Sequence, residues 1–219
     1  MDTLKVFAND DGEFGNPVGV VVDTEQKINS SDRQKIATES GYSEIVFIDN
    51  FENGNVSIYT PVHQIPFAGH ALVGVAYFLK QKFDYKLPRL FSLNSEIKIW
   101  TTEKLTWVNG SLSILPKWNF EQLDSSDKVN GLSLDQTANK LHTFVWAWLD
   151  ESKGLIRART FANDWGIPED EANGSGSMRL ASNLNREITV IHGKGSVIHA
   201  RPSTNNSAEV GGLVWFGDK

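Results

Sequence analysis

Three side chains stand in sequence surroundings that suit acid–base chemistry. Glu44 lies within an apolar, strand-like segment, so it is either a solvent-facing strand residue or a base whose pKa is raised by partial burial. His70 directly follows Gly69 at the start of an apolar run, where it would lie beside the N–H groups of a first helical turn. Asp170 belongs to an acidic triplet, a pattern more typical of a solvated loop or of a charged helix start.

Two glycine-led segments supply a second kind of chemistry. Gly69 begins one of them, and Gly174, with Ser175 and Gly176 after it, begins the other. The free N–H groups of a first helical turn, with the helix dipole behind them, bind carboxylate or phosphate groups. The two glycines are 105 positions apart (69 to 174), close to half of the 219 residues. This spacing predicts two similar halves whose helix starts face one another across a cleft.

Other chemistries fit the sequence less well. Ser175, His70 and Asp170 are the residue types of a hydrolase triad, but residues 173–177 lack the G-x-S-x-G spacing of a nucleophile elbow. His63 and His70 have no partner at metal-ligand spacing, so no metal site is expected. The chain has no cysteine, which excludes a thiolate mechanism and a zinc–cysteine site.

The elements that must position these residues follow from the hydrophobic pattern. Residues 72–79 leave no polar face, which predicts a buried central helix that starts near Gly69. A second helix is predicted from Gly174 towards residue 184, and capping-box spacings predict shorter ones over 31–41 and 133–141. The predicted strands are 4–8, 18–22, 43–48, 56–60, 96–100, 105–108, 111–115, 143–149, 154–160, 187–192, 197–201 and 210–216.

Two connections matter for the organisation of the chain. Asn109-Gly110 is the strongest short-range hairpin signal, and it predicts a turn between the strands 105–108 and 111–115. Residues 116–131 are polar and form the predicted linker between the halves. Each half then mixes strands with one main buried helix, which is an α+β pattern.

Composition limits the partners and the location. The net charge of −6 without a Lys/Arg cluster argues against nucleic acid and against anionic membranes. No apolar run reaches membrane-spanning length, and the N-terminal residues do not resemble a signal peptide. The absence of cysteine fits a cytoplasmic protein.

Together these residues resemble the phenazine-biosynthesis isomerase (PhzF-like) family, which is related in fold to diaminopimelate epimerase. The likeness spans nearly the whole chain and its motifs follow the family's order. It rests on Val6-Phe7 with Phe14-Gly15-Asn16-Pro17-Val18, Ser43-Glu44, Tyr59-Thr60-Pro61 to Pro66-Phe67-Ala68-Gly69-His70, and Arg159-Thr160-Phe161-Ala162 to Ile167-Pro168-Glu169-Asp170-Glu171-Ala172-Asn173-Gly174-Ser175.

The resemblance implies two pseudo-symmetric halves, residues 1–115 and a shortened 116–219, each a mixed sheet wrapped around a central helix. It also implies a homodimer with neither cofactor nor metal. Glu44 matches the family's proton-transferring glutamate, and the expected catalytic residues are Glu44, His70 and Asp170. The expected substrate-binding residues are Asn16, Gly69, Gly174, Ser175 and Gly176.

The implied reaction is an isomerisation of a small carboxylate-bearing metabolite, in which a single carboxylate moves a proton within one face. The chain departs from the family pattern in three places. Ala71 replaces a proline, Glu171 and Asn173 replace a proline and a threonine, and little sequence separates the strands on either side of residues 151–153. A non-catalytic binding or scaffolding protein of the same fold is the alternative, because it would share every motif.

Overall fold

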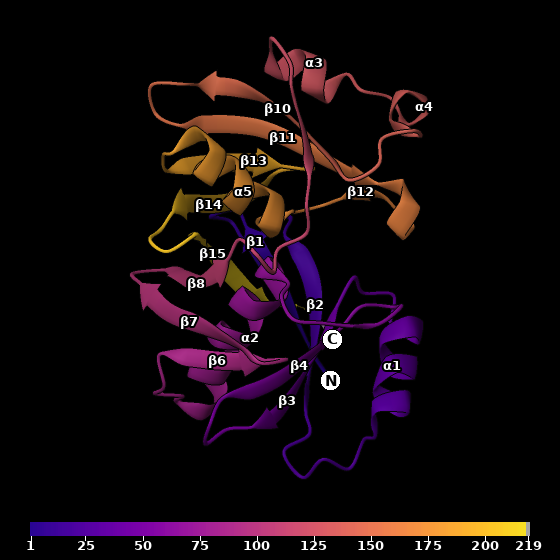
Figure 1. Cartoon of the computed structure of the whole chain (residues 1–219), viewed down its shortest axis with the longest axis vertical. Coiled ribbons are helices and arrows are strands. Elements are labelled where there is room, and N and C mark those ends of the chain that lie inside the picture. The colour runs from indigo at the N-terminus through magenta and orange to yellow at the C-terminus, as the bar shows by residue number, and fades with distance from the viewer. Residues whose placement is uncertain (218–219) are drawn as a thin grey trace.

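The computed structural model describes residues 1–217, in which β-strands curl around two main helices in two stacked halves (Figure 1). The helices are α1 (Ser30–Glu39), α2 (Gly69–Phe83), α3 (Ser126–Asn130), α4 (Leu134–Thr137), α5 (Gly174–Leu184) and the 3-10 turn η1 (Asn163–Trp165). The strands of the first half are β1 (Asp2–Ala8), β2 (Asn16–Val22), β3 (Ile45–Asn50), β4 (Asn55–Tyr59), β5 (Gln64–Ile65), β6 (Arg89–Ser92), β7 (Ser95–Thr102) and β8 (Leu105–Ser111). The remaining strands are β9 (Asn119–Gln122), β10 (Thr143–Asp150), β11 (Leu155–Ala162), β12 (Ile167–Asp170), β13 (Ile188–His192), β14 (Ser196–Pro202) and β15 (Ser207–Phe216).

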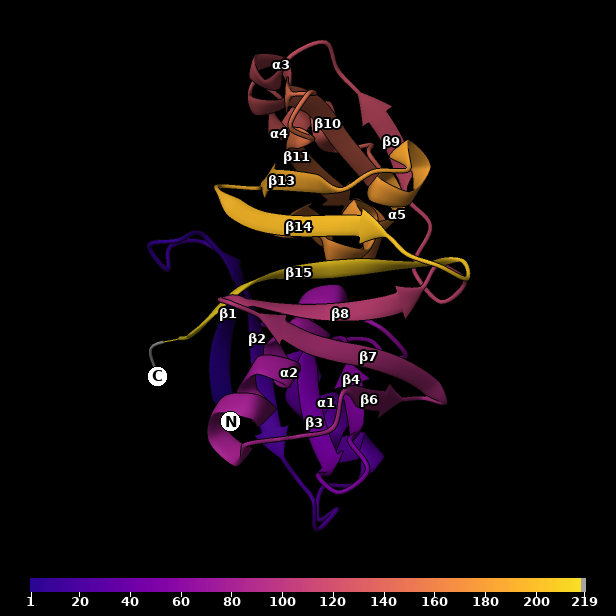
Figure 2. The ribbon, with the colours of Figure 1, turned by 90° about the vertical axis from the view of Figure 1, so that its left-hand side faces the viewer.

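The strands of the first half close into a ring around α2. Their order is β1-β2-β3-β4-β6-β7-β8-β15, and β15 pairs back onto β1. The last strand of the chain is therefore needed to close the half that contains the first strand. In Figure 2, β15 lies between β8 below it and β14 above it, at the junction of the two halves.

The second half repeats this strand order without closing. It runs β15-β14-β13-β11-β10-β9 and ends at β9. The parallel pair β2/β3 has its counterpart in β9/β10, and the parallel pair β4/β6 has its counterpart in β11/β13. Helix α5 packs on β14 and β15 as α2 packs on β8 and β1. These observations confirm the predicted α+β fold with two similar halves, each built around one helix.

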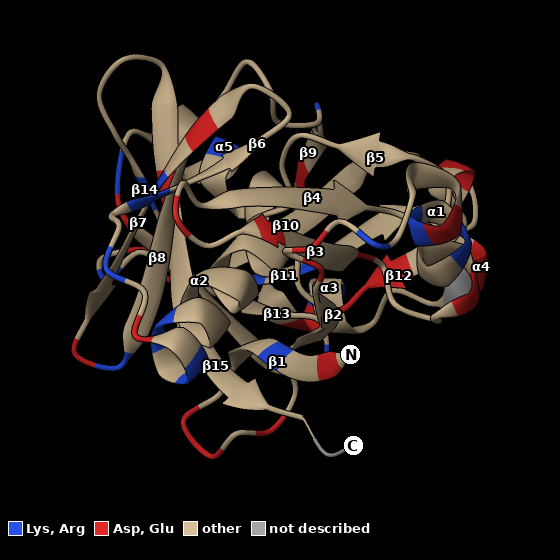
Figure 3. Ribbon diagram, turned by 90° about the horizontal axis from the view of Figure 1, so that it is seen from below, with Lys and Arg blue, Asp and Glu red and all other residues tan. Residues whose placement is uncertain are grey.

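Helix α2 is the centre of the main core, as its apolar run predicted. Leu72, Val73 and Val75 are among the residues of this helix with no exposed surface. Gly74 lets the helix lie against the sheet, because a Cβ there would be 2.9 Å from Val18 Cγ1. The last turn carries Lys80 and Lys82, which complement the helix dipole (Figure 3).

The predicted turn at Asn109-Gly110 is wrong, because both residues lie inside β8. This strand pairs with β7 and β15 through Asn109, and the turn of the β7–β8 hairpin is at residues 103–104. Gly110 is there for close packing, since a Cβ would lie 2.5 Å from the Phe67 ring. Of residues 111–115, predicted as a strand, Ser111 ends β8 and residues 112–115 form a turn and irregular chain.

Smaller differences concern the ends of elements. The predicted linker 116–131 contains β9 and α3, and the helix predicted over 133–141 ends at Thr137 after its capping box of Ser133 and Gln136. Helix α1 begins at Ser30 with Asn29 as its N-cap. Within residues 1–217, no helix is long and apolar enough to cross a membrane.

Candidate active site

Glu44 and His70 form the closest pair of ionisable groups at this site. Glu44 directly precedes β3, so the strand predicted to begin at residue 43 begins two residues later. His70 is the second residue of α2, and its Nε2 lies 3.1 Å from Glu44 Oε2 and 3.4 Å from Ser43 Oγ. The side chains of His70 and Glu44 are only 7% and 15% exposed, so the pair is shielded from water.

The carboxylate of Glu44 has His70 as its charged partner. Oε2 of Glu44 is buried and lies 3.1 Å from His70 Nε2, and this ion pair is its only polar interaction with the described residues. A buried carboxylate costs free energy unless an opposite charge accompanies it, and His70 supplies that charge here. A carboxylate in such a place can act as a general base towards a substrate.

Burial and charge act in opposite directions on this pair. Burial favours the neutral carboxyl of Glu44, but the charge and hydrogen bond of His70, together with a hydrogen bond from Ser43, outweigh burial and lower the pKa of Glu44. Burial also favours neutral imidazole, but the carboxylates of Glu44 and Asp170 outweigh burial and raise the pKa of His70. Both shifts favour the pair of a carboxylate and an imidazolium.

Asp170, the last residue of β12, is held by donors from both halves of the chain. Its Oδ1 accepts hydrogen bonds from Asn16 Nδ2 (2.9 Å) and from the backbone N–H of Ala172 (3.3 Å). Its Oδ2 accepts from Asn173 Nδ2 (3.0 Å). Burial raises the pKa of Asp170, and the nearby charge of His70 only partly offsets this effect. The buried Asn16 side chain is thus engaged in holding Asp170.

The two helix starts meet directly, as the half-chain spacing predicted. A Cβ built on Gly69 would lie 3.3 Å from Gly174 Cα, and a Cβ on Gly174 would lie 3.4 Å from Gly69 Cα. This contact explains glycine at both positions, because a side chain on either residue would press on backbone. No side chain caps the start of α2, which leaves its first N–H groups available to an anion.

The start of α5 differs, because Asn173 caps it. The Oδ1 of Asn173 accepts from the Gly176 N–H at 2.6 Å and from Ser175 Oγ at 3.4 Å. The N–H of Gly176, one of the expected substrate-binding residues, is thus used inside the protein. Ser175 also accepts a hydrogen bond from Trp118 Nε1 at 3.0 Å.

The structure brings the sequence-predicted residues together at one place, where α2 and α5 begin. Glu44, His70 and Asp170 interact electrostatically, and Asn16, Gly69, Gly174, Ser175 and Gly176 surround them. The sequence analysis did not select Asn173 or Trp118. Asn173 stands before a glycine-led helix and is a preferred N-cap type, so it had a signal. Trp118 had no such sequence signal, because it lies in residues 116–131, the predicted linker.

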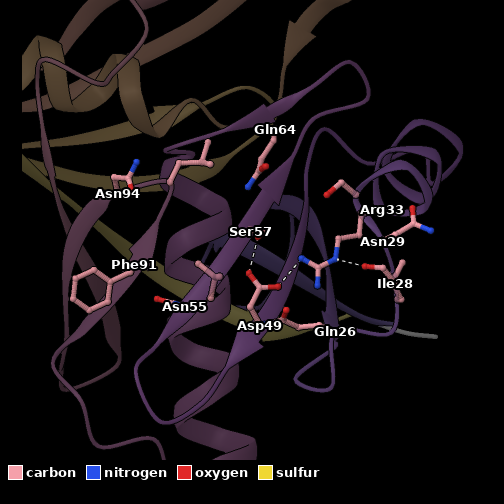
Figure 4. A pocket seen from close by; sticks show the side chains of 13 residues that line it. Gln26, Ile28, Asn29, Arg33, Asp49, Asn55, Ser57, Gln64, Phe91 and Asn94 are labelled. Atoms are coloured by element: carbon pink, nitrogen blue, oxygen red, sulfur yellow. Dashed lines mark hydrogen bonds and ion pairs between the residues drawn. The ribbon is translucent and has the colours of Figure 1, made fainter.

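A hollow of the described surface lies elsewhere (Figure 4). It has a volume of about 660 Å³ and lies between α1, β4 and the β6–β7 turn. Arg33 at its wall is bonded to Asp23 (2.7 Å) and Asp49 (2.5 Å), and Asp49 also accepts from Ser57. The charged groups at this wall thus bond one another. In residues 1–217, no three His, Asp or Glu side chains are grouped to hold a metal ion.

Comparison with known proteins gives consistent matches. A sequence profile of the family described as phenazine biosynthesis-like protein (PhzC-PhzF) matches residues 4–102. The trans-2,3-dihydro-3-hydroxyanthranilate isomerase of Pseudomonas aeruginosa is 36% identical, over 82% of this chain and 78% of its own length. A PhzF-family structure from Enterococcus faecalis superposes with a TM-score of 0.79 at 18% identity, covering 98% of this chain and 95% of that one. A structure from P. aeruginosa described as a predicted epimerase gives 0.69 at 18% identity, covering 99% and 96%.

Proposed function

Because the chain belongs to the phenazine biosynthesis-like (PhzF) family of isomerases, we propose that it is an isomerase that moves a proton on a small carboxylate-bearing metabolite. The Pseudomonas relative is named for an isomerisation of trans-2,3-dihydro-3-hydroxyanthranilate, which is itself a small carboxylate. We propose further that the reaction needs no cofactor and that the substrate binds between the two halves.

The observation that carries the proposal is the buried carboxylate of Glu44, whose pKa is lowered beside His70. A lowered pKa favours the ionised carboxylate, which can accept a proton from a substrate carbon. It stands beside His70, on the helix whose uncapped first turn suits a carboxylate. The proposed base, Glu44, and the proposed carboxylate-binding turn at the start of α2 are therefore neighbours in the structure.

In the proposed reaction, Glu44 moves a proton between two carbons of a bound substrate. The substrate carboxylate binds the free N–H groups at the start of α2. Glu44 takes a proton from one carbon, the electron pair shifts along the adjacent double bond, and Glu44 returns the proton to another carbon of the same face. The His70 imidazolium stabilises the negative charge that develops in between. The proton lost from one carbon is gained by the other, so no other reactant is consumed.

Replacement of Glu44 tests this role. Glu44→Gln keeps the shape of the side chain but cannot accept a proton from carbon. We expect it to lower proton transfer by at least about 10²-fold, while substrate affinity changes far less. The measurement is incorporation of solvent deuterium into trans-2,3-dihydro-3-hydroxyanthranilate, followed by mass spectrometry in deuterated water.

Glu25→Gln, a change at an exposed glutamate, is the matched control and should exchange like the wild type. Equal exchange in the wild type and in Glu44→Gln would remove Glu44 from the reaction. Binding of the compound without exchange in the wild type would instead favour the non-catalytic binding protein, the alternative that shares the same motifs.

We further propose that the protein is a cytoplasmic homodimer. The proposal rests on the family to which the chain belongs and, for location, on a sequence without cysteine, which suits a reducing compartment. Light scattering at micromolar concentration should give twice the mass of 24.4 kDa. A single-chain mass under these conditions would contradict the dimer.

A further inference from the structure

The second half of the fold lacks a counterpart of β1. In the first half, β1 lies between β15 and β2 and closes the ring. At the corresponding place in the second half, residues 112–118 connect β8 to β9 without strand pairing, and we name them the strap. The strap carries backbone carbonyl groups that a neighbouring strand would otherwise bond.

Arg179 of α5 bonds these carbonyl groups instead. Its Nη2 donates to the carbonyl oxygens of Leu112 (2.8 Å) and Leu115 (2.6 Å), and its Nε donates to that of Pro116 (2.5 Å). Three charge-assisted hydrogen bonds from one side chain fix the strap on α5. The strap is thereby attached to the helix that begins at the candidate active site.

Trp118 ends the strap, and its indole is held at several points. Its Nε1–H donates to Ser175 Oγ at 3.0 Å, one residue after the contact of the two helix starts. Its ring meets those of His142 and Trp165 edge-on, with centroids 6.0 Å and 5.5 Å away. His142 is held in turn by Asp164, with Nε2 and Oδ2 2.9 Å apart. The orientation of the indole is thus fixed before any ligand binds.

We propose that Trp118 is a specificity-determining residue that selects substrates with a flat ring next to the carboxylate. The inference rests on the proposed function, because it places the substrate carboxylate at the start of α2, beside Gly174 and Ser175. A group attached to that carboxylate would lie next to Ser175, whose hydroxyl accepts the hydrogen bond of the indole. A fixed aromatic face favours a flat ring over a puckered one of equal size, and little side-chain entropy is lost.

The competing explanation is that Trp118 only covers the open side of the second half. A covering residue would affect stability, and any apolar side chain of similar size would replace it. A ring-selecting residue would affect the preference between ligands, and only another aromatic side chain would replace it. The pair Trp118→Phe and Trp118→Leu separates the two, because both fill space and only Phe keeps a flat face.

The experiment measures the affinity of three probes by calorimetry: benzoate, with a flat ring; cyclohexanecarboxylate, with a puckered ring of similar size; and acetate, with no ring. We expect the wild type to prefer benzoate over cyclohexanecarboxylate by about tenfold. Trp118→Phe should keep most of this preference and Trp118→Leu should lose it, with the affinity for acetate unchanged. Trp215→Phe, at a largely exposed strand tryptophan, is the control and should behave like the wild type.

Two results would overturn the inference. One is a benzoate preference in Trp118→Leu equal to that of the wild type; the other is a loss of acetate and benzoate affinity by the same factor. A wild type that binds none of the probes would overturn both the inference and the carboxylate seat of the proposed function. Unchanged deuterium exchange in Glu44→Gln, together with loss of the benzoate preference in Trp118→Leu, would reject only the proposed base.

Discussion

At the scale of single residues, the site is defined by three ionisable groups with different environments. Burial acts on all of them, but the carboxylates of Glu44 and Asp170 raise the pKa of His70, and His70 in turn lowers the pKa of Glu44. Asp170 has amide donors on both oxygens and yet has a raised pKa. Environments that push the pKa values of neighbouring acids apart are typical of sites that move protons.

The charge of His70 leads to a prediction about pH dependence. In the wild type, the rate of deuterium exchange should decline at acidic pH with a midpoint below 4.5, the ordinary glutamate pKa, because His70 lowers the pKa of Glu44. His70→Gln removes the cation, so burial dominates and the midpoint of the acidic decline should move to higher pH. The wild type should also lose exchange activity above pH 6.5, when His70 loses its proton, and this second decline should be absent in His70→Gln.

The measurement is the pH profile of deuterium exchange in both proteins, with His63→Gln at an exposed histidine as control. The two limbs report the coupled pair rather than either residue by itself. An acidic limb that stays in place in His70→Gln would show that His70 does not set the charge of Glu44.

At the scale of elements, the two central helices begin alike but serve different tasks. Helix α2 begins uncapped and buries most of its surface, while α5 begins with Asn173 as a cap. The Asn173 amide accepts from the helix through Oδ1 and donates to Asp170 through Nδ2. One side chain therefore caps the start of the helix and holds a catalytic candidate at the same time.

Substitutions of Asn173 should separate these two tasks. Asn173→Ala loses both the cap and the donor to Asp170. Asn173→Ser keeps an oxygen that can accept from Gly176, but it also loses the donor. We expect Asn173→Ser to be more stable than Asn173→Ala by about 1 kcal/mol, while both reduce deuterium exchange to a similar extent.

Urea unfolding measures the first quantity and mass spectrometry the second. Equal stability of the two variants would argue against the cap. Full exchange activity in either variant would argue that the donor to Asp170 has no part in the reaction.

At the scale of the whole molecule, β15 joins the two halves. It pairs with β1 and β8 on one side of the division near residue 115 and with β14 on the other. The first half is therefore incomplete without the end of the chain. The site lies where the halves meet, because Asn16 and Asp170 are 154 positions apart and bond directly.

This sharing predicts that residues 1–115 do not fold by themselves. The fragment would expose the edges of β1 and β8, which are covered by β15 in the whole chain. A chain in which residues 207–217 follow residue 115 through a short glycine–serine linker should fold, because Ser207 lies opposite Ser111 in an antiparallel pair. Cooperative thermal unfolding, followed by circular dichroism, is the measurement. A cooperative transition in the fragment 1–115 would contradict the prediction.

The sequence by itself determined the two central helices and the place where they begin. An apolar run without a polar face can only be buried, and a glycine at its start permits the close contact of Gly69 with Gly174. The spacing of these glycines indicated two similar halves, and His70 stood out by its place after a glycine at a helix start. Glu44 had two local interpretations, and the resemblance to the PhzF-like family indicated the base. These signals depend on residue types and on their order along the chain.

Only the tertiary structure decided which strands close each half and what completes the site. Asn109-Gly110 reads as a turn in isolation, but the pairing of β8 with two neighbouring strands keeps the chain extended there. Trp118 acquires a partner in Ser175, 57 positions away, through a strap that Arg179 holds. Such contacts depend on where distant segments pack, and hydrophobic periodicity carries no information about the partner of a given side chain.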